Sequence, residues 1–162
     1  MSERLTTRRS WGPVLEKDGG VEFRLWAPEE QAVTLLMGDK EIALRQTGEG
    51  WHGITTTARP GDSYVFRLVD GTTLPDPAAH AQAGDVHGPS LLVDHDAYPW
   101  QNTGWTGRPW EEAVLYELHI GTFTPEGTFR SATERLPYLK DIGITAIEIM
   151  PVSHFAGRRG WG

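Results

Sequence analysis

The strongest constraint on the fold is a change of hydrophobic pattern part-way along the chain. Between residues 20 and 69 apolar and polar side chains alternate, whereas residues 113–150 hold two continuous apolar segments separated by a helical pattern. Alternation is typical of strands with one buried face, and continuous apolar strands are typical of a sheet covered on both faces. The 162 residues therefore predict a β part followed by an α/β part.

The first pattern predicts five or more short antiparallel strands. Val21, Phe23 and Leu25 fall on one side of the first strand, and polar residues fall on the other. The further strands are expected at residues 32–37, 41–44, 51–57 and 63–69. The chain contains 19 glycines and 11 prolines, which favour many turns over a helical bundle. We expect an immunoglobulin-like β-sandwich over residues 1–95, held without disulfides because the chain has no cysteine.

In residues 71–112 the apolar side chains follow neither the strand nor the helix period, so this segment is predicted to be irregular but ordered. The stretch contains five of the eleven prolines and three tryptophans, Trp100, Trp105 and Trp110. Because disordered linkers are poor in aromatic residues, we expect these tryptophans to lie against a neighbouring domain. Residues 96–112 are the expected connector between the two domains.

The second pattern predicts a strand, a helix and a parallel strand. The first strand is expected within AVLYELHIGTF, residues 113–123, and the second over residues 144–150. The helix is predicted to begin at a capping box formed by Ser131 and Glu134 and to end at Gly143, although Pro137 lies inside it. Two parallel strands and one helix leave both sheet faces uncovered, so we expect residues 113–162 to be part of a larger, truncated α/β domain.

Several motifs are similar to those of one enzyme family. In the second half they are YELHIGTFTPEGTF (116–129), LPYLKDIGITAIEIMPV (136–152) and HFAGRRGWG (154–162), and in the first half RSWGP (9–13), FRLWAP (23–28), and LPDPA with VHGPS (74–78 and 86–90). The chain resembles the α-amylase family, glycoside hydrolase family 13, and the last motif is similar to that of its trehalose-releasing branch. One departure is PDPAAHAQ (75–82), where the family usually reads P-D-P-A-S-R-F.

The resemblance implies a cytoplasmic glycosidase that cleaves the α-1,4 bond next to the trehalose end of malto-oligosyltrehalose, as part of trehalose biosynthesis. It implies an N-terminal β-sandwich followed by a (β/α)₈ TIM barrel, of which residues 113–162 form the first β-α-β unit. The family uses a retaining mechanism whose carboxylates come from later barrel strands, so no catalytic residue is assigned here. Two alternatives stay open: a glucan-binding β-sandwich without catalysis, and the N-terminal part of a glycogen branching or debranching enzyme.

Two glutamates and five histidines are candidates for catalytic or metal-binding roles. Glu117 and Glu148 lie mid-strand, away from the strand ends where barrel enzymes place their chemistry, which favours a structural role. Hydrogen-bonded structural roles are also expected for His119 and His154. The other three, His80, His87 and His95, lack the spacing of a zinc site. We predict no metal and no cofactor.

Tryptophans are the remaining candidates for contact with a sugar ligand. Trp161 follows the second barrel strand and is predicted to contact substrate, because substrate loops gather at that end of a barrel. Its neighbours Arg158 and Arg159 are expected to pair with acids elsewhere in the barrel. Trp26 is expected in the core of the sandwich. Trp11 and Trp51 are left open between core packing and stacking on sugar rings.

Charge and hydropathy exclude two classes of partner. The net charge is −7, which is unlike the basic surface of proteins that bind nucleic acid. Neither a long apolar run nor a secretory signal is present, which argues against a membrane partner. The expected partners are malto-oligosyltrehalose or a related α-glucan, and the remainder of the same barrel.

Overall fold

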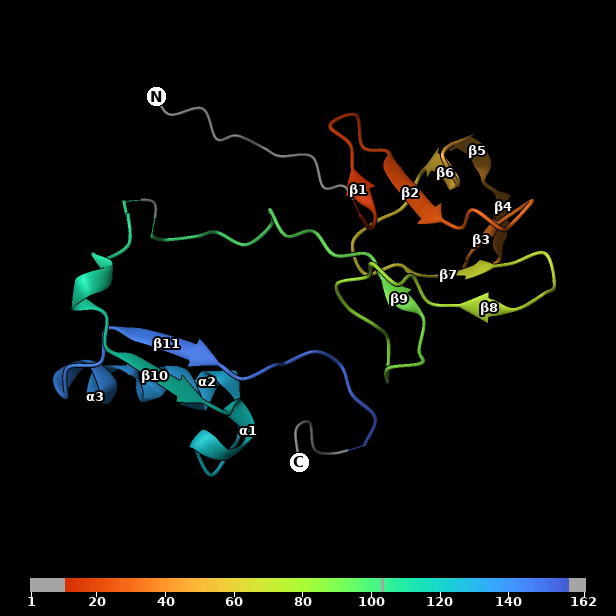
Figure 1. Ribbon diagram of the computed structural model, residues 1–162. Helices are drawn as coiled ribbons and strands as arrows, with labels where there is room; N and C mark the ends of the chain where they lie inside the picture. The colour runs from red at the N-terminus through yellow and green to blue at the C-terminus, as the bar shows by residue number, and fades with distance from the viewer. Residues whose placement is uncertain (1–10, 103, 158–162) are drawn as a thin grey trace. The chain divides into compact units, whose positions relative to one another are not determined.

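The computed structural model describes residues 11–102 and 104–157 (Figure 1). The chain forms two compact units, Met1–Tyr98 and Pro99–Gly162, which are described separately. The strands of the first unit are β1 Val14–Leu15, β2 Val21–Trp26, β3 Thr34–Met37, β4 Lys40–Ala43, β5 Arg45–Gly48, β6 Trp51–Thr56, β7 Ser63–Arg67, β8 Thr73–Leu74 and β9 Ser90–Leu91.

These strands pair into two antiparallel sheets. One has the order β1-β2-β6-β5, and the other has the order β4-β3-β7-β8, with β9 also paired to β7. The strands β2 and β6 run in register from Val21 opposite Thr56 to Trp26 opposite Trp51. The alternation seen in the sequence thus becomes an inner and an outer face of each sheet.

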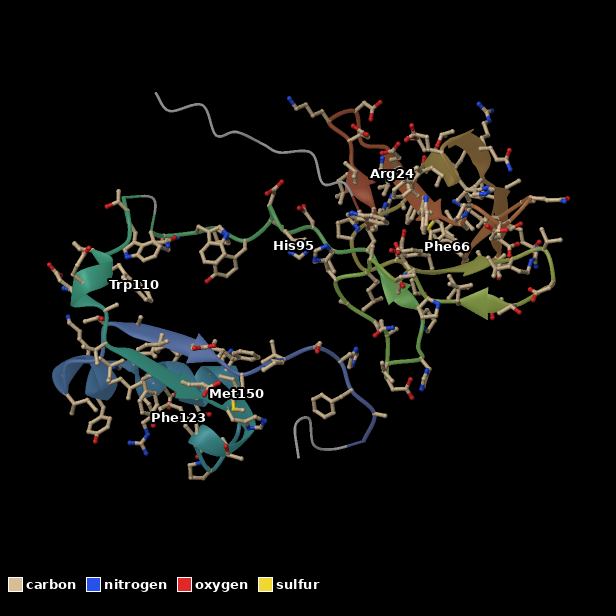
Figure 2. All side chains as sticks on the ribbon, in the orientation of Figure 1. Arg24, Phe66, His95, Trp110, Phe123 and Met150 are labelled. Carbon is tan, nitrogen blue, oxygen red and sulfur yellow. The ribbon has the colours of Figure 1, made fainter. Side chains whose placement is uncertain are left out.

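The core of the first unit is built from both sheets. Phe23 of β2 packs edge-on against Tyr64 of β7, with ring centroids 4.9 Å apart, and Tyr64 packs in the same way against Phe66 at 5.9 Å (Figure 2). The other buried apolar residues of this cluster are Val21, Leu25, Val33, Leu35, Met37, Leu44 and Leu92. This two-sheet arrangement is consistent with the predicted β-sandwich.

The shortest strands were absent from the prediction. The segment predicted to be irregular contains β8 and β9, and both of them pair with β7. Strand β5 lies between two of the expected strands and was not itself predicted, and it forms a hairpin with β6. Strands of two to four residues are too short to show a period, so they depend on pairing with a neighbour rather than on their own sequence.

The second unit is a small α/β arrangement. Its elements are the 3₁₀ turn η1 Trp110–Glu112, β10 Leu115–Leu118, α1 Ile120–Phe123, α2 Phe129–Glu134, α3 Leu136–Asp141 and β11 Ala146–Ile149. β10 and β11 pair in parallel, from Leu115 opposite Ala146 to Leu118 opposite Ile149. The predicted parallel pair of strands is therefore confirmed.

The predicted helix is wrong in two respects. It is two helices rather than one, because Pro137 lies in the first turn of α3, where its missing N–H costs no hydrogen bond. The capping box is also formed earlier: Thr128 is the N-cap of α2, and Ser131 is the residue that completes the box. The first strand is shorter than expected as well, because residues 120–123 are helical.

The strands of the second unit are not covered on both faces by the residues that the structure describes. Their large apolar side chains are partly exposed: Val114, Leu115, Tyr116, Ile147 and Ile149. Helices α2 and α3 each bury one apolar residue, Ala132 and Leu139. The tryptophans at 100, 105 and 110 are also exposed. Their packing against a neighbouring domain stays a prediction.

Candidate functional site

An aromatic cluster lies on the outer face of β2 and β6. Trp26 and Trp51 face each other across the two strands. The ring centroids of Trp51 and Trp11 are 4.9 Å apart, with 51° between the planes, and the guanidinium carbon of Arg24 lies 4.9 Å from the Trp51 centroid (Figure 2). Trp51 is thus partly covered by two neighbours, whereas Trp11 and Trp26 remain 58% and 52% exposed.

The expectation that Trp26 lies in the core is wrong. Val21, Phe23 and Leu25 are the buried residues of β2, so position 26 falls on the opposite face of the alternation. The indole Nε1 of Trp26 instead donates a 3.0 Å hydrogen bond to the backbone oxygen of Glu49. Trp26 therefore supports the β5–β6 turn from the outer face of the sheet.

Glu117 and Glu148 are brought side by side. They are direct partners in the register of β10 and β11, mid-strand, and both are exposed. Neither side chain makes a hydrogen bond with another described residue, and the structural role expected for them stays a prediction. A catalytic acid and a catalytic base need different environments, one that keeps a carboxyl protonated and one that keeps a carboxylate ionised. Two carboxylates that are both exposed and lie side by side do not have this difference.

His119 makes a local contact. It is the N-cap of α1, and its Nδ1 lies 3.3 Å from the hydroxyl oxygen of Thr122, in agreement with a structural role. The imidazole rings of His80 and His95 are also in contact, with centroids 4.6 Å apart. Among residues 11–102 and 104–157 no group of three or more metal-ligating side chains gathers.

A compact polar cluster follows α1, and its side-chain contacts were not predicted from the sequence. The Ser131 hydroxyl lies 2.6 Å from the Thr124 hydroxyl and 2.9 Å from the Thr128 hydroxyl. Ser131 also donates to the backbone oxygen of Thr128 at 3.0 Å. These contacts fix the turn between α1 and α2, which follows the carboxyl end of β10.

The predicted substrate contact cannot be placed. Trp161 lies outside the described residues, as do Arg158 and Arg159. The carboxyl ends of the two strands are joined in the described residues, because the backbone N–H of Met150 donates a 3.0 Å hydrogen bond to the backbone oxygen of Leu118. In the same described ranges, no helix has the length and apolar character needed to cross a membrane.

Comparison with known proteins identifies relatives along most of the chain. Proteins named malto-oligosyltrehalose trehalohydrolase are 41% identical over 143 residues in Deinococcus radiodurans and 46% identical over 149 residues in Mycobacterium tuberculosis. These matches cover 88% and 87% of this chain. The chain is similar to one part of these malto-oligosyltrehalose trehalohydrolases. It spans about a quarter of their length, 24% and 25% respectively.

Two further proteins are similar to this chain. A 1,4-alpha-glucan branching enzyme of Burkholderia vietnamiensis is 32% identical over 176 residues, covering 88% of this chain and 24% of that enzyme. A solved structure named as an alpha amylase of Salmonella typhimurium is 50% identical with a TM-score of 0.89, over 95% of this chain and 26% of that one. No family model matches the chain.

Proposed function

We propose that this chain is part of an enzyme that hydrolyses malto-oligosyltrehalose and releases free trehalose. One observation carries the proposal: 41–46% identity to trehalohydrolases over almost nine-tenths of the chain. The lower identity to a branching enzyme, 32%, favours hydrolysis over branching. The proposed enzyme acts in the cytoplasm on α-1,4-linked glucans that end in trehalose.

The chain would supply the first domain of this enzyme and the beginning of its catalytic domain. Residues 1–95 would be an immunoglobulin-like β-sandwich, residues 96–112 a connector, and residues 113–162 the first β-α-β unit of a (β/α)₈ barrel. The two antiparallel sheets with one shared core, and the parallel pair β10–β11, support these assignments. The exposed apolar side chains of β10 and β11 would be covered by the remaining barrel elements.

The catalytic carboxylates would come from outside these residues. A retaining glycosidase needs two carboxyl groups about 5–5.5 Å apart, one as nucleophile and one as acid and base. Glu117 and Glu148 lie mid-strand, whereas barrel enzymes place their chemistry at the carboxyl ends of the strands. Trp161, which follows β11 in the sequence, is proposed to contact the substrate at that end.

The test uses the protein made by the source cells. An antibody raised against the first unit captures the native polypeptide, which is incubated with maltotriosyltrehalose. We expect the release of free trehalose and maltotriose without transfer of glucan chains. Formation of new α-1,6 branches would assign the protein to the branching enzymes. Release of no trehalose by a captured polypeptide that is intact would reject the proposal.

A second candidate function is glucan binding by the first unit. The exposed indoles of Trp11 and Trp26, on the outer face of one sheet, favour it, because sugar rings stack on exposed aromatic faces. Titration calorimetry of the full chain with maltoheptaose would detect such binding. The Trp26→Ala variant should lose it, whereas the Trp105→Ala control, at an exposed tryptophan of the second unit, should keep it.

A further inference from the structure

A closed loop projects from the first unit between Asp76 and Ser90. Its residues, 77–89, contain no buried side chain, whereas both flanking residues are buried. Its two ends meet, because the backbone N–H of Asp76 donates a 2.7 Å hydrogen bond to the Ser90 hydroxyl oxygen. Compact loops with adjoining ends and contacts of their own often behave as separate units.

The loop is also joined to itself. The backbone N–H of Ala83 donates a 2.8 Å hydrogen bond to the backbone oxygen of Pro89. The backbone N–H of Leu91 donates another, also of 2.8 Å, to the backbone oxygen of Ala81. Gly88 approaches Ala83 so closely that a Cβ at position 88 would lie 1.9 Å from the Ala83 carbonyl oxygen. Closure of the loop therefore requires glycine at this position.

A buried polar cluster fastens the base of the loop to the core. The Tyr64 hydroxyl donates a 2.8 Å hydrogen bond to Oδ2 of Asp76, and Oδ1 of Asp76 accepts another from the backbone N–H of Ala78 at 2.8 Å. Tyr64, Asp76 and Ser90 are 1%, 4% and 0% exposed. We call these three residues the polar latch.

The loop and the sheets are held by different forces. The sheets enclose the apolar cluster around Phe23, Leu35 and Phe66. No side chain of the loop is fully buried, so releasing the loop exposes less apolar surface than unpairing the sheets. It breaks the hydrogen bonds of the loop and the contact between the His80 and His95 rings. A hydrogen bond to a buried carboxylate is among the stronger ones, which makes the Tyr64–Asp76 bond the main restraint.

We propose that the polar latch is a conformational device that allows residues 77–89 to open as one unit while the two sheets stay paired. Opening begins when the Tyr64–Asp76 hydrogen bond breaks. The backbones of Gly12 and Ala78 are in contact, since a Cβ on Gly12 would lie only 2.7 Å from the backbone oxygen of Ala78. Opening of the loop therefore also affects the segment around Gly12. Gly12 follows Trp11, whose ring is in tilted contact with that of Trp51, so opening of the loop alters the support of the aromatic cluster.

Hydrogen exchange of the full chain tests the proposal. The Tyr64→Phe variant keeps the ring in the core and removes the hydroxyl. We expect exchange of the Ala83 and Leu91 amides to become about ten- to a hundredfold faster, as expected for loss of a bond to a carboxylate. The paired amides of β2 and β6 should change much less. Equal acceleration of all these amides, or no acceleration of the loop amides, would overturn the proposal.

Three further variants separate the latch from general stability. Leu35→Ala weakens the core at a residue that belongs neither to the polar latch nor to the aromatic row around Tyr64, so it should accelerate the sheet amides at least as much as the loop amides. Tyr138→Phe makes the same chemical change at an exposed tyrosine and should alter neither set. Gly88→Ala should accelerate the loop amides alone. If Gly88→Ala instead unpaired the sheets, the loop would not be a separate unit, and this result remains informative even if Tyr64→Phe fails to fold.

Discussion

The indole Nε1 of Trp26 and the backbone oxygen of Glu49 are joined by a 3.0 Å hydrogen bond across the outer face of the first unit. Glu49 has a φ of 50°, a left-handed backbone conformation that is uncommon for residues with a side chain. It lies in the turn of the β5–β6 hairpin, between Gly48 and Gly50. An exposed tryptophan thus supports a strained turn 23 residues away in the sequence.

Trp26→Phe is expected to lower the free energy of unfolding by about 1 kcal/mol, because the carbonyl of Glu49 loses its donor. Urea denaturation of the full chain measures this difference. The control is Trp105→Phe, at an exposed tryptophan whose side chain makes no hydrogen bond with another described residue, and it should leave the midpoint unchanged. Equal midpoints for Trp26→Phe and the native chain would show that the bond contributes nothing.

The glycines of two turns should tolerate alanine unequally. Both Gly38 and Gly50 have positive φ, but a Cβ on Gly50 would lie 2.7 Å from Cβ of Pro28, whereas a Cβ on Gly38 would meet nothing within 4 Å. Gly38→Ala should cost about 1 kcal/mol for backbone strain alone, and Gly50→Ala about 2–4 kcal/mol for strain and clash. Thermal unfolding of the two variants gives the comparison. Similar losses of stability would mean that Pro28 moves away freely.

Stability should depend on the ionisation of Asp76. Burial raises the pKa of this carboxyl above 3.8, opposed by the hydrogen bonds from Ala78 and Tyr64 and by the charge of His80. The folded state therefore holds the proton more tightly than the unfolded state, so this group lowers stability as pH rises from 3.8 through the folded-state pKa. Denaturation of the native chain and of Asp76→Asn across this range should give curves that diverge as pH rises. Parallel curves would contradict the assignment.

Glu41 should respond to pH in the opposite sense. Arg67 holds its carboxylate with two hydrogen bonds, one of them 2.9 Å between Nη1 and Oε1, and these bonds and the positive charge lower the pKa of Glu41 below 4.5. The pair therefore stabilises the fold above pH 4.5 and loses this effect as pH falls through the folded-state pKa. Carboxyl NMR titration should show a higher pKa for Glu41 in Arg67→Gln. An unchanged titration would show that the pair does not form in solution.

The sequence predicted features that repeat within a single element. The alternation of Val21, Phe23 and Leu25 identified the inner face of β2, and the same alternation, followed one residue further, places Trp26 outside. The parallel pair β10–β11 was predicted from two continuous apolar segments. Pro137 signalled an irregularity in the helix, but only the structure shows that α2 ends and α3 begins there.

Features that depend on distant partners left no local signal. Strands β8 and β9 are two residues long and exist because β7 pairs with them. The Tyr64–Asp76 bond joins residues 12 positions apart, and nothing around either residue indicates that the tyrosine is buried with an acid beside it. Glu117 and Glu148 were expected on neighbouring strands, and their exact pairing followed only from the register.

The most direct test of the central proposal is the size of the polypeptide that carries these residues in its source cells. Immunoblotting with an antibody against the first unit gives this mass. Because the chain spans about a quarter of its relatives, we expect a mass several-fold above 18.0 kDa, which would place the catalytic strands in the same polypeptide. A single band at 18.0 kDa would contradict the trehalose-releasing function and leave glucan binding by the first unit as the function to test.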